Sequence, residues 1–212
     1  MHKRELVASM ITSAKSVLEE AGYAGRKTVS VKIRVHKDLR DTVDFVRTVL
    51  DAGVDFITIH GRTRNTASSV PVNLEAIKLV ASHITVPTLA NGDVFCLEDA
   101  YAITSATGVK GVMSARGLLE NPGLFSPRKP TKGSVVCEWE VVERFMNYVA
   151  RAPLPFKLVV HHLTEMVGSD HSQAGKTLFT KEEKMGLLEW YVSYMFFYLV
   201  DDMQIIISIY AC

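Results

Sequence analysis

The sequence alternates between two kinds of segment, and this alternation limits the fold more than any other feature. Short stretches rich in β-branched residues begin near Thr28, Val54, Val86 and Gly111, and apolar residues at helical spacing follow each of them. The strand-like stretches recur at intervals of roughly 25–30 residues, the length of one strand–helix unit with a right-handed crossover. The pattern therefore predicts consecutive βα units that share a parallel sheet.

The number of these units bounds the architecture. Helices are expected at about residues 3–20, 38–52, 73–83, 97–105, 138–150 and 155–167. A closed (β/α)8 barrel needs eight units and typically about 250 residues. This chain has 212 residues and four predicted units, so we expect the C-terminal half of a TIM (β/α)8 barrel followed by a helical region. The alternative is a small open, doubly wound sheet with its site at a topological switch point.

Two of the predicted strands end abruptly in polar residues. The stretch VPTLANGDV closes on Asn91-Gly92-Asp93, and the stretch GVMSARGLL closes on Ala115-Arg116-Gly117. Gly92 permits a positive φ or a close approach of the backbone to a ligand. Paired loops late in a parallel α/β barrel are the usual place for a phosphate. We therefore expect these two loops to form a phosphate site.

The two earlier strands carry further candidates. Residues 28–35 alternate, which places Lys32 and Arg34 on the polar face of the strand. In a barrel this face lines the interior, where charge is costly unless a ligand receives it. A strand with a solvated polar face has the same pattern, so the pattern leaves both interpretations open. His60 follows the next strand, and its place at a C-terminal strand end strengthens the case for a site residue.

Cysteine usage and charge narrow the class of protein. Cys96, Cys137 and Cys212 are widely spaced and form no Cys-x-x-Cys pair, so we expect no disulfide scaffold, no metal site and an intracellular, cytoplasmic protein. The net charge of +1 does not by itself demand nucleic acid. A basic bias between Arg128 and Lys157 would suit a phosphate backbone, although a solvated surface is the commoner explanation.

The end of the chain has a different character. From Met185 onward it is apolar and aromatic, but Glu189, Asp201 and Asp202 interrupt the run. No uninterrupted apolar run reaches the roughly 18–20 residues that a membrane span needs, so we expect no membrane association. We interpret this stretch as a buried or poorly specified tail.

Four motifs stand in an order that points to one family. They are KIR at Lys32–Arg34, TIHGRT at Thr58–Thr63, LANGDV at Leu89–Val94 and VMSARGLLENPGLF at Val112–Phe125. Together they resemble the tRNA-dihydrouridine synthases, FMN-dependent enzymes with a TIM barrel and a helical tRNA-binding domain. The resemblance is greatest to the eukaryotic members that act on positions 20a and 20b of the tRNA D loop. It runs from about Glu5 to Phe125, continues weakly to about Val167 and then fades.

The resemblance implies a role for each motif. Arg34 matches a contact to the substrate base, and the residues that match FMN contacts are Lys32, His60, Asn91, Gly92, Asp93, Ala115 and Arg116, the last five at the phosphate. The implied reaction reduces uridine to 5,6-dihydrouridine in tRNA, with FMN as cofactor and NADPH as reductant. The chain would then comprise an FMN-binding partial barrel at 1–125, a tRNA-binding-like helical region at 126–170 and an atypical apolar tail at 171–212.

One departure from the family bears on activity. The family's proton donor is a cysteine in the loop after the third barrel strand, and Arg4–Val7 resembles the start of the helix that follows that loop. We therefore expect a truncated chain that lacks three strands and this cysteine, with no catalytic residue to assign and no activity of its own. The alternatives are a non-catalytic RNA-binding or interaction fragment, and another FMN barrel with a small-molecule substrate, against which KIR and TIHGRT argue.

Overall fold

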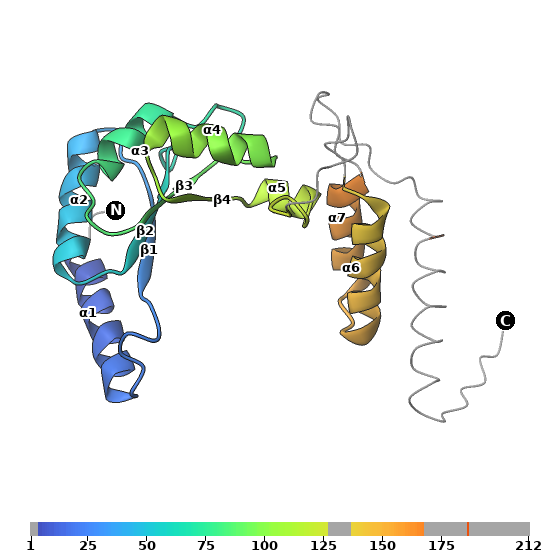
Figure 1. Cartoon of the computed structure of the whole chain (residues 1–212), viewed down its shortest axis with the longest axis horizontal. Coiled ribbons are helices and arrows are strands. Elements are labelled where there is room, and N and C mark those ends of the chain that lie inside the picture. Colours follow the sequence, from blue (N-terminus) through green and yellow to red (C-terminus); the bar gives the residue numbers. More distant parts are fainter. Residues whose placement is uncertain (1–3, 127–136, 168–185, 187–212) are drawn as a thin grey trace. The chain divides into compact units, whose positions relative to one another are not determined.

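The computed structural model describes residues 4–126, 137–167 and Gly186 (Figure 1). The chain divides into two compact units, Met1–Gly117 and Leu118–Cys212, and each is considered by itself. Apart from Gly186, the predicted tail at 171–212 lies outside the described residues, as do Arg128 and Lys129. The three-part division predicted from the sequence, with boundaries at 125 and 170, stays a prediction.

The first unit alternates helices and strands. Its elements are α1 (Arg4–Glu20), β1 (Ser30–Arg34), α2 (Leu39–Asp51), β2 (Phe56–His60), α3 (Leu74–Ala81), β3 (Thr88–Asn91), α4 (Leu97–Thr107) and β4 (Gly111–Met113). Every strand and helix predicted for this part is therefore confirmed. The strand that begins at Gly111, β4, ends at Met113, and at Arg116 the chain enters a short helix, α5 (Arg116–Glu120), that the sequence analysis did not predict.

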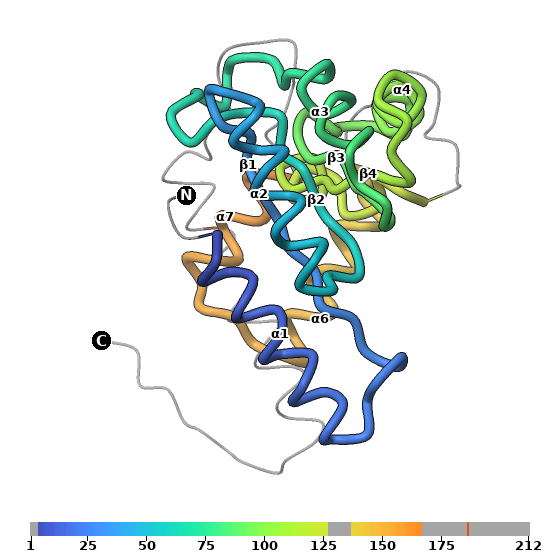
Figure 2. The backbone as a smooth tube through the Cα atoms, turned by 90° about the vertical axis from the view of Figure 1, so that its left-hand side faces the viewer, coloured from blue at the N-terminus to red at the C-terminus, as the bar shows by residue number. Residues whose placement is uncertain are grey.

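The strands lie in the order β1-β2-β3-β4, and each neighbouring pair is parallel (Figure 2). Each connecting helix thus returns the chain to the next position in the same direction. A doubly wound sheet reverses its strand order at a switch point. The described strands contain no such reversal, so the doubly wound alternative was wrong for this part of the chain. The arrangement is consistent with a partial α/β barrel.

The helices form one layer over one face of the sheet (Figures 1 and 2). Along this layer α1 contacts α2, α2 contacts α3, and α3 contacts α4. The side chains between layer and sheet are fully buried, among them Val46, Ile57, Ile59, Ile77 and Val80. Each such side chain contributes about 1.5–3 kcal/mol on burial. This apolar layer holds the strands in register and so positions the loops at their C-terminal ends.

The opposite face of the sheet is polar at its first strand. In β1, Ile33 is buried, whereas Lys32 and Arg34 are exposed. The predicted alternation of this strand is therefore confirmed. The two cations lie on the face that the described helices leave uncovered.

The second unit contains a pair of helices, α6 (Trp139–Arg151) and α7 (Phe156–Val167), as predicted. They pack through a small core of Cys137, Val142, Met146, Val149, Val159, Leu163 and Met166. Arg144, Arg151 and Lys157 are exposed on these helices, and Arg144 pairs with Glu140 at 3.1 Å. Across the residues that the structure describes, no helix has both the length and the apolar character needed to cross a membrane.

Candidate functional site

The C-terminal ends of the four strands bring the sequence motifs into one row. The sheet register pairs Arg34 with His60, His60 with Asn91, and Asn91 with Met113. Registered residues of parallel strands project to the same face of a sheet. The strand-end residues from all four motifs are therefore neighbours, although they are widely separated in the sequence.

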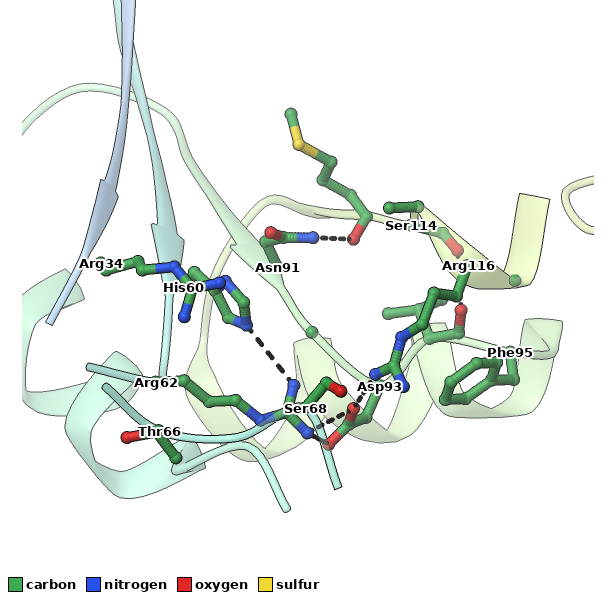
Figure 3. Close-up of a pocket in the computed structure, with 15 residues that line it drawn as sticks. Arg34, His60, Arg62, Thr66, Ser68, Asn91, Asp93, Phe95, Ser114 and Arg116 are labelled. Atoms are coloured by element: carbon green, nitrogen blue, oxygen red, sulfur yellow. Dashed lines mark hydrogen bonds and ion pairs between the residues drawn. The ribbon is translucent and has the colours of Figure 1, made fainter. Parts of the chain in front are cut away.

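A cavity of about 170 Å³ lies at this edge of the sheet (Figure 3). The predicted site residues that line it are Arg34, His60, Asn91, Gly92, Asp93, Ala115 and Arg116. Lys32 is outside this lining, because it stands two residues before Arg34 on the same face of β1. Thr66, Ser68 and Ser114 also line the cavity. The two loops that were predicted to form one site do meet.

Asp93 is the centre of a charged cluster in this cavity. Its carboxylate oxygens accept from Nη2 of Arg62 at 2.7 and 2.6 Å, and one of them accepts from Nη2 of Arg116 at 3.0 Å. The backbone N–H of Val72 donates to the other oxygen at 2.8 Å. Figure 3 shows both guanidinium groups converging on this carboxylate. Asp93 thus joins the loops that follow β2, β3 and β4.

Arg62 is the residue that the sequence did not single out. Only 4 % of its side chain is exposed, and its Nε donates to the carbonyl of Val70 at 2.6 Å. Its place in the TIHGRT motif, two residues after His60, was the only available signal. Nothing in the local sequence distinguishes it from an exposed loop arginine such as Arg64.

The backbone around the site is tightly constrained. Gly92 has φ +124°, and a Cβ at this position would lie 2.9 Å from Cγ2 of Val72. A Cβ at Gly61 would lie 2.6 Å from the carbonyl oxygen of Asn73. Side chains cannot be accommodated at such distances without a shift of the neighbours. Asp93 has φ +54°, a conformation that Asp tolerates better than most residues.

Asn91 serves mainly to join two strands. Its Nδ2 donates to the carbonyl of Met113 at 2.8 Å, at the end of the neighbouring strand. Ser114 makes a second such link, since its Oγ donates to the carbonyl of Val94 at 2.7 Å. These bonds fix the spacing of the loops that follow β3 and β4.

Burial and the nearby positive charges lower the pKa values of His60 and Lys32. Burial, together with the positive charges of Arg34, Lys32 and Arg62, lowers the pKa of His60 to about 4. Burial and the charge of Arg34 also lower the pKa of Lys32. At neutral pH the imidazole of His60 is therefore uncharged, and its Nε2 lies 3.4 Å from Nη1 of Arg62.

Asp93 shifts in the direction expected of a paired carboxylate. Burial is the largest single influence and favours the neutral acid, but hydrogen bonds from Arg62 and Val72 and the charges of Arg62 and Arg116 outweigh it. The net effect lowers the pKa of Asp93, so the carboxylate is ionised. The cavity then contains one anion among several cations, which suits it to bind a second anion.

His60 predicts a pH dependence of stability. Its folded-state pKa of about 4 is below the ordinary value of 6.5, so the unfolded chain binds this proton more tightly. The free energy of unfolding should therefore rise as the pH increases from about 4 to 6.5, and His60 should add no slope above that range. Urea titrations followed by far-UV circular dichroism would measure it. His60→Gln should flatten the rise, whereas the exposed-site change His83→Gln should not; an undiminished rise in His60→Gln would refute the assignment.

Neither of the two described cysteines, Cys96 and Cys137, lines the cavity. Cys96 caps the N-terminus of α4 and is half-buried, and Cys137 belongs to the core of the second unit. Burial is the largest cause of the raised pKa of each thiol, so neither is a thiolate at neutral pH. Within residues 4–126 and 137–167, no group of histidine, cysteine and carboxylate side chains is arranged to hold a metal ion.

Comparison with known proteins identifies relatives of the chain. The dihydrouridine synthase (Dus) family model matches residues 1–192, which extends past the predicted end of the resemblance near Val167. The chain is 39% identical over 199 residues to tRNA-dihydrouridine(20a/20b) synthase of Saccharomyces cerevisiae, covering 90% of this chain and 51% of that protein. The protein of the same name in Schizosaccharomyces pombe is 39% identical over 186 residues, covering 88% and 54%.

More distant similarities follow the same pattern. The human protein named tRNA-dihydrouridine(20a/20b) synthase-like is 33% identical over 84% of this chain and 53% of its own length. The chain therefore spans about half the length of the curated relatives it matches. A solved structure of mandelate oxidase aligns with 65% of this chain and 47% of its own, at 17% identity and a TM-score of 0.32, which is too low to bear on fold or function.

Proposed function

The chain belongs to the dihydrouridine synthase family, and from this premise we propose that it carries the FMN-phosphate-binding part of a tRNA-dihydrouridine synthase of the 20a/20b type. The substrate is a uridine in the tRNA D loop, the product is 5,6-dihydrouridine and the reductant is NADPH. One observation carries the proposal: Arg34, Arg62 and Arg116 border one cavity at the C-terminal edge of a parallel sheet. The free thiols Cys96 and Cys137 are in keeping with an intracellular site for this reaction.

The residues of the cavity fit the phosphate end of FMN. Guanidinium groups bind phosphate through paired N–H donors, and Arg116 lines the cavity with its side chain 45% exposed. Gly92 and Ala115 present backbone without a bulky side chain, which lets an anion approach closely. Asn91 and Asp93 hold these loops in place through their own hydrogen bonds. The phosphate would occupy this cavity of about 170 Å³ at the C-terminal edge of the sheet.

The flavin ring would lie over the remaining polar residues of the open face. When bound, FMN supplies the hydride that reduces the C5–C6 double bond of uracil. Lys32 and the neutral imidazole of His60 would contact the ring, and Arg34 would contact the substrate base. In the structure Nη1 of Arg34 donates to the carbonyl of Thr63 at 2.9 Å, which orients its guanidinium.

The first unit is best understood as the C-terminal half of a TIM barrel. Sequential parallel strands, helices on one face and cations on the other all support this assignment. In a closed barrel the face of Lys32 and Arg34 would line the interior, where a ligand would receive their charge.

Flavin binding tests the proposal directly. The purified chain should bind FMN more tightly than riboflavin, which lacks the phosphate, as measured by quenching of flavin fluorescence. Equal affinity for the two flavins would refute a phosphate site. Incubation with tRNA, FMN and NADPH should yield no dihydrouridine from this chain by itself. The reason is that, of the described residues, none that lines the cavity is a cysteine, the proton donor that the family resemblance implies.

A second candidate function is a non-catalytic RNA-binding fragment. The exposed cations Arg144, Arg151 and Lys157 on α6 and α7 favour it. Binding to tRNA in a gel shift should then occur without flavin and weaken steeply as the salt concentration rises. Failure to bind tRNA at low salt would exclude this candidate.

A further inference from the structure

We propose that Arg62 and Asp93 are positioning residues, which together hold the Gly92 loop and Arg116 in the geometry that receives a phosphate. Asp93 is then not a ligand of the anion, although it lines the cavity. The inference rests on the proposed function of this cavity as a phosphate site. It assigns distinct roles to three residues that the sequence places in separate motifs.

The contacts of Asp93 exclude it as a direct phosphate ligand. Both carboxylate oxygens already accept hydrogen bonds, from Arg62 at 2.7 and 2.6 Å, from Arg116 at 3.0 Å and from the N–H of Val72 at 2.8 Å. Its lowered pKa keeps the group negatively charged, and a second anion at contact distance would be repelled. The carboxylate can therefore help the phosphate only through the groups that it holds.

The buried side chain of Arg62 links Asp93 to the segment that contains Val70. Besides Asp93, Arg62 binds the carbonyl of Val70 at 2.6 Å. The segment that contains Val70 and Val72 is thereby tied to the loop after β3 through both partners of the ion pair. Because Val72 also contacts the position of the absent Cβ of Gly92, this tie limits the path of the Gly92 backbone.

Arg116 is held at two points and is otherwise directed to the cavity. One of its nitrogens binds Asp93 at 3.0 Å, and its guanidinium carbon lies 5.0 Å from the centre of the Phe95 ring (Figure 3). A side chain that is already ordered loses less conformational entropy when it binds a ligand. Asp93 thus contributes by orienting Arg116 before the phosphate arrives.

The direction in which Asp93→Asn changes the affinity for FMN tests this inference. Asp93→Asn removes a negative charge beside the site, so electrostatics alone predicts tighter FMN binding. The positioning role predicts the opposite, a loss of FMN affinity of about 10- to 100-fold, by analogy with the groups that orient metal ligands. Riboflavin affinity should not change. Glu98→Gln, which removes an exposed charge at the start of α4, should leave both affinities unchanged.

Hydrogen exchange provides a readout that needs no flavin. In Asp93→Asn and in Arg62→Lys, which keeps the charge but not the paired geometry, amides near Val72 and Gly92 should exchange faster than in the parent chain or in Glu98→Gln. Cooperative urea unfolding would establish that both variants are folded. Unchanged exchange, or FMN binding by Asp93→Asn as tight as in the parent, would overturn the inference. If the parent fails to prefer FMN over riboflavin, the proposed function fails. The exchange result alone then decides whether Arg62 and Asp93 hold the Gly92 loop in place.

Discussion

Asp93→Ala is expected to lower the free energy of unfolding of the first unit by about 3–4 kcal/mol, within the range for breaking a buried ion pair. The substitution leaves the Arg62 guanidinium buried, at 4 % exposure, without its carboxylate. It also places Ala at φ +54°, which adds about 1 kcal/mol of backbone strain. Urea titration followed by far-UV circular dichroism would measure the loss.

Matched variants separate the two contributions to this loss of stability, the broken ion pair and the backbone strain. Asp93→Gly removes the carboxylate but relieves the strain, so it should be less harmful than Asp93→Ala by about 1 kcal/mol. Arg62→Met should also cost less, because Asp93 is 26% exposed and keeps Arg116 and the N–H of Val72 as partners. Asp44→Ala, on the exposed face of α2, is the control. If Asp93→Ala were no more destabilising than this control, the ion pair would have no stabilising role.

The loss of unfolding free energy in Asp93→Ala should depend on pH, because the carboxylate of Asp93 titrates. The pKa of Asp93 in the folded chain is below the ordinary 3.8, so its stabilising contribution is complete above that value. It is lost as the pH falls through the lowered pKa of the folded state. The difference in stability between the parent and Asp93→Ala should therefore shrink at strongly acidic pH.

Arg116→Ala should weaken FMN binding by about 10- to 100-fold while leaving riboflavin binding unchanged. A hydrogen bond between charged groups is worth about 1.5–3 kcal/mol, and about 1.4 kcal/mol corresponds to tenfold in affinity. Its effect on stability should be small, at most about 1 kcal/mol, because the side chain is 45% exposed and its ion pair is at the surface. Fluorescence titration with the two flavins measures the affinities.

Two further variants serve as controls for the FMN affinity of Arg116→Ala. Arg116→Lys keeps the charge but not the planar set of donors, so its FMN affinity should be intermediate. Arg64→Ala removes an exposed arginine from the loop after β2 and should leave FMN affinity unchanged. Normal FMN binding by Arg116→Ala would show that the phosphate lies elsewhere. Arg116 and Asp93 thus differ in a testable way, since one variant mainly loses ligand affinity and the other loses both affinity and stability.

Much of the fold could be predicted because its signals are local. Runs of β-branched residues predicted the strands. Apolar residues at helical spacing predicted the helices, as in α2 and α6. Asp38 and Asn73 cap α2 and α3, with their side chains accepting from backbone N–H groups at 2.9 and 2.8 Å. The end of β4 was less predictable, because GVMSARGLL is apolar on both sides of the turn at Ser114.

The sequence could predict that the strand-end residues gather at one edge of the sheet, but it could not predict the contacts among their side chains. Loops after successive parallel strands must meet at one edge of the sheet, so the gathering of His60, Asn91 and Arg116 followed from the strand pattern. The role of Arg62 did not follow, because burial depends on what packs over a side chain. The sequence context of Asp93 likewise does not reveal that both of its carboxylate oxygens already accept hydrogen bonds.

The sequence by itself determined the alternation of strands and helices, the order of the polar loops that follow the strands, and the family to which the chain belongs. These depend on periodicity, capping and short motifs, all of which are properties of neighbouring residues. Only the tertiary structure decided that the strands follow one another without reversal, and that Arg62 closes on Asp93, 31 residues later in the chain. The physical reason is that a side chain's partners and its exposure to water are set by segments that meet only after the sheet has formed.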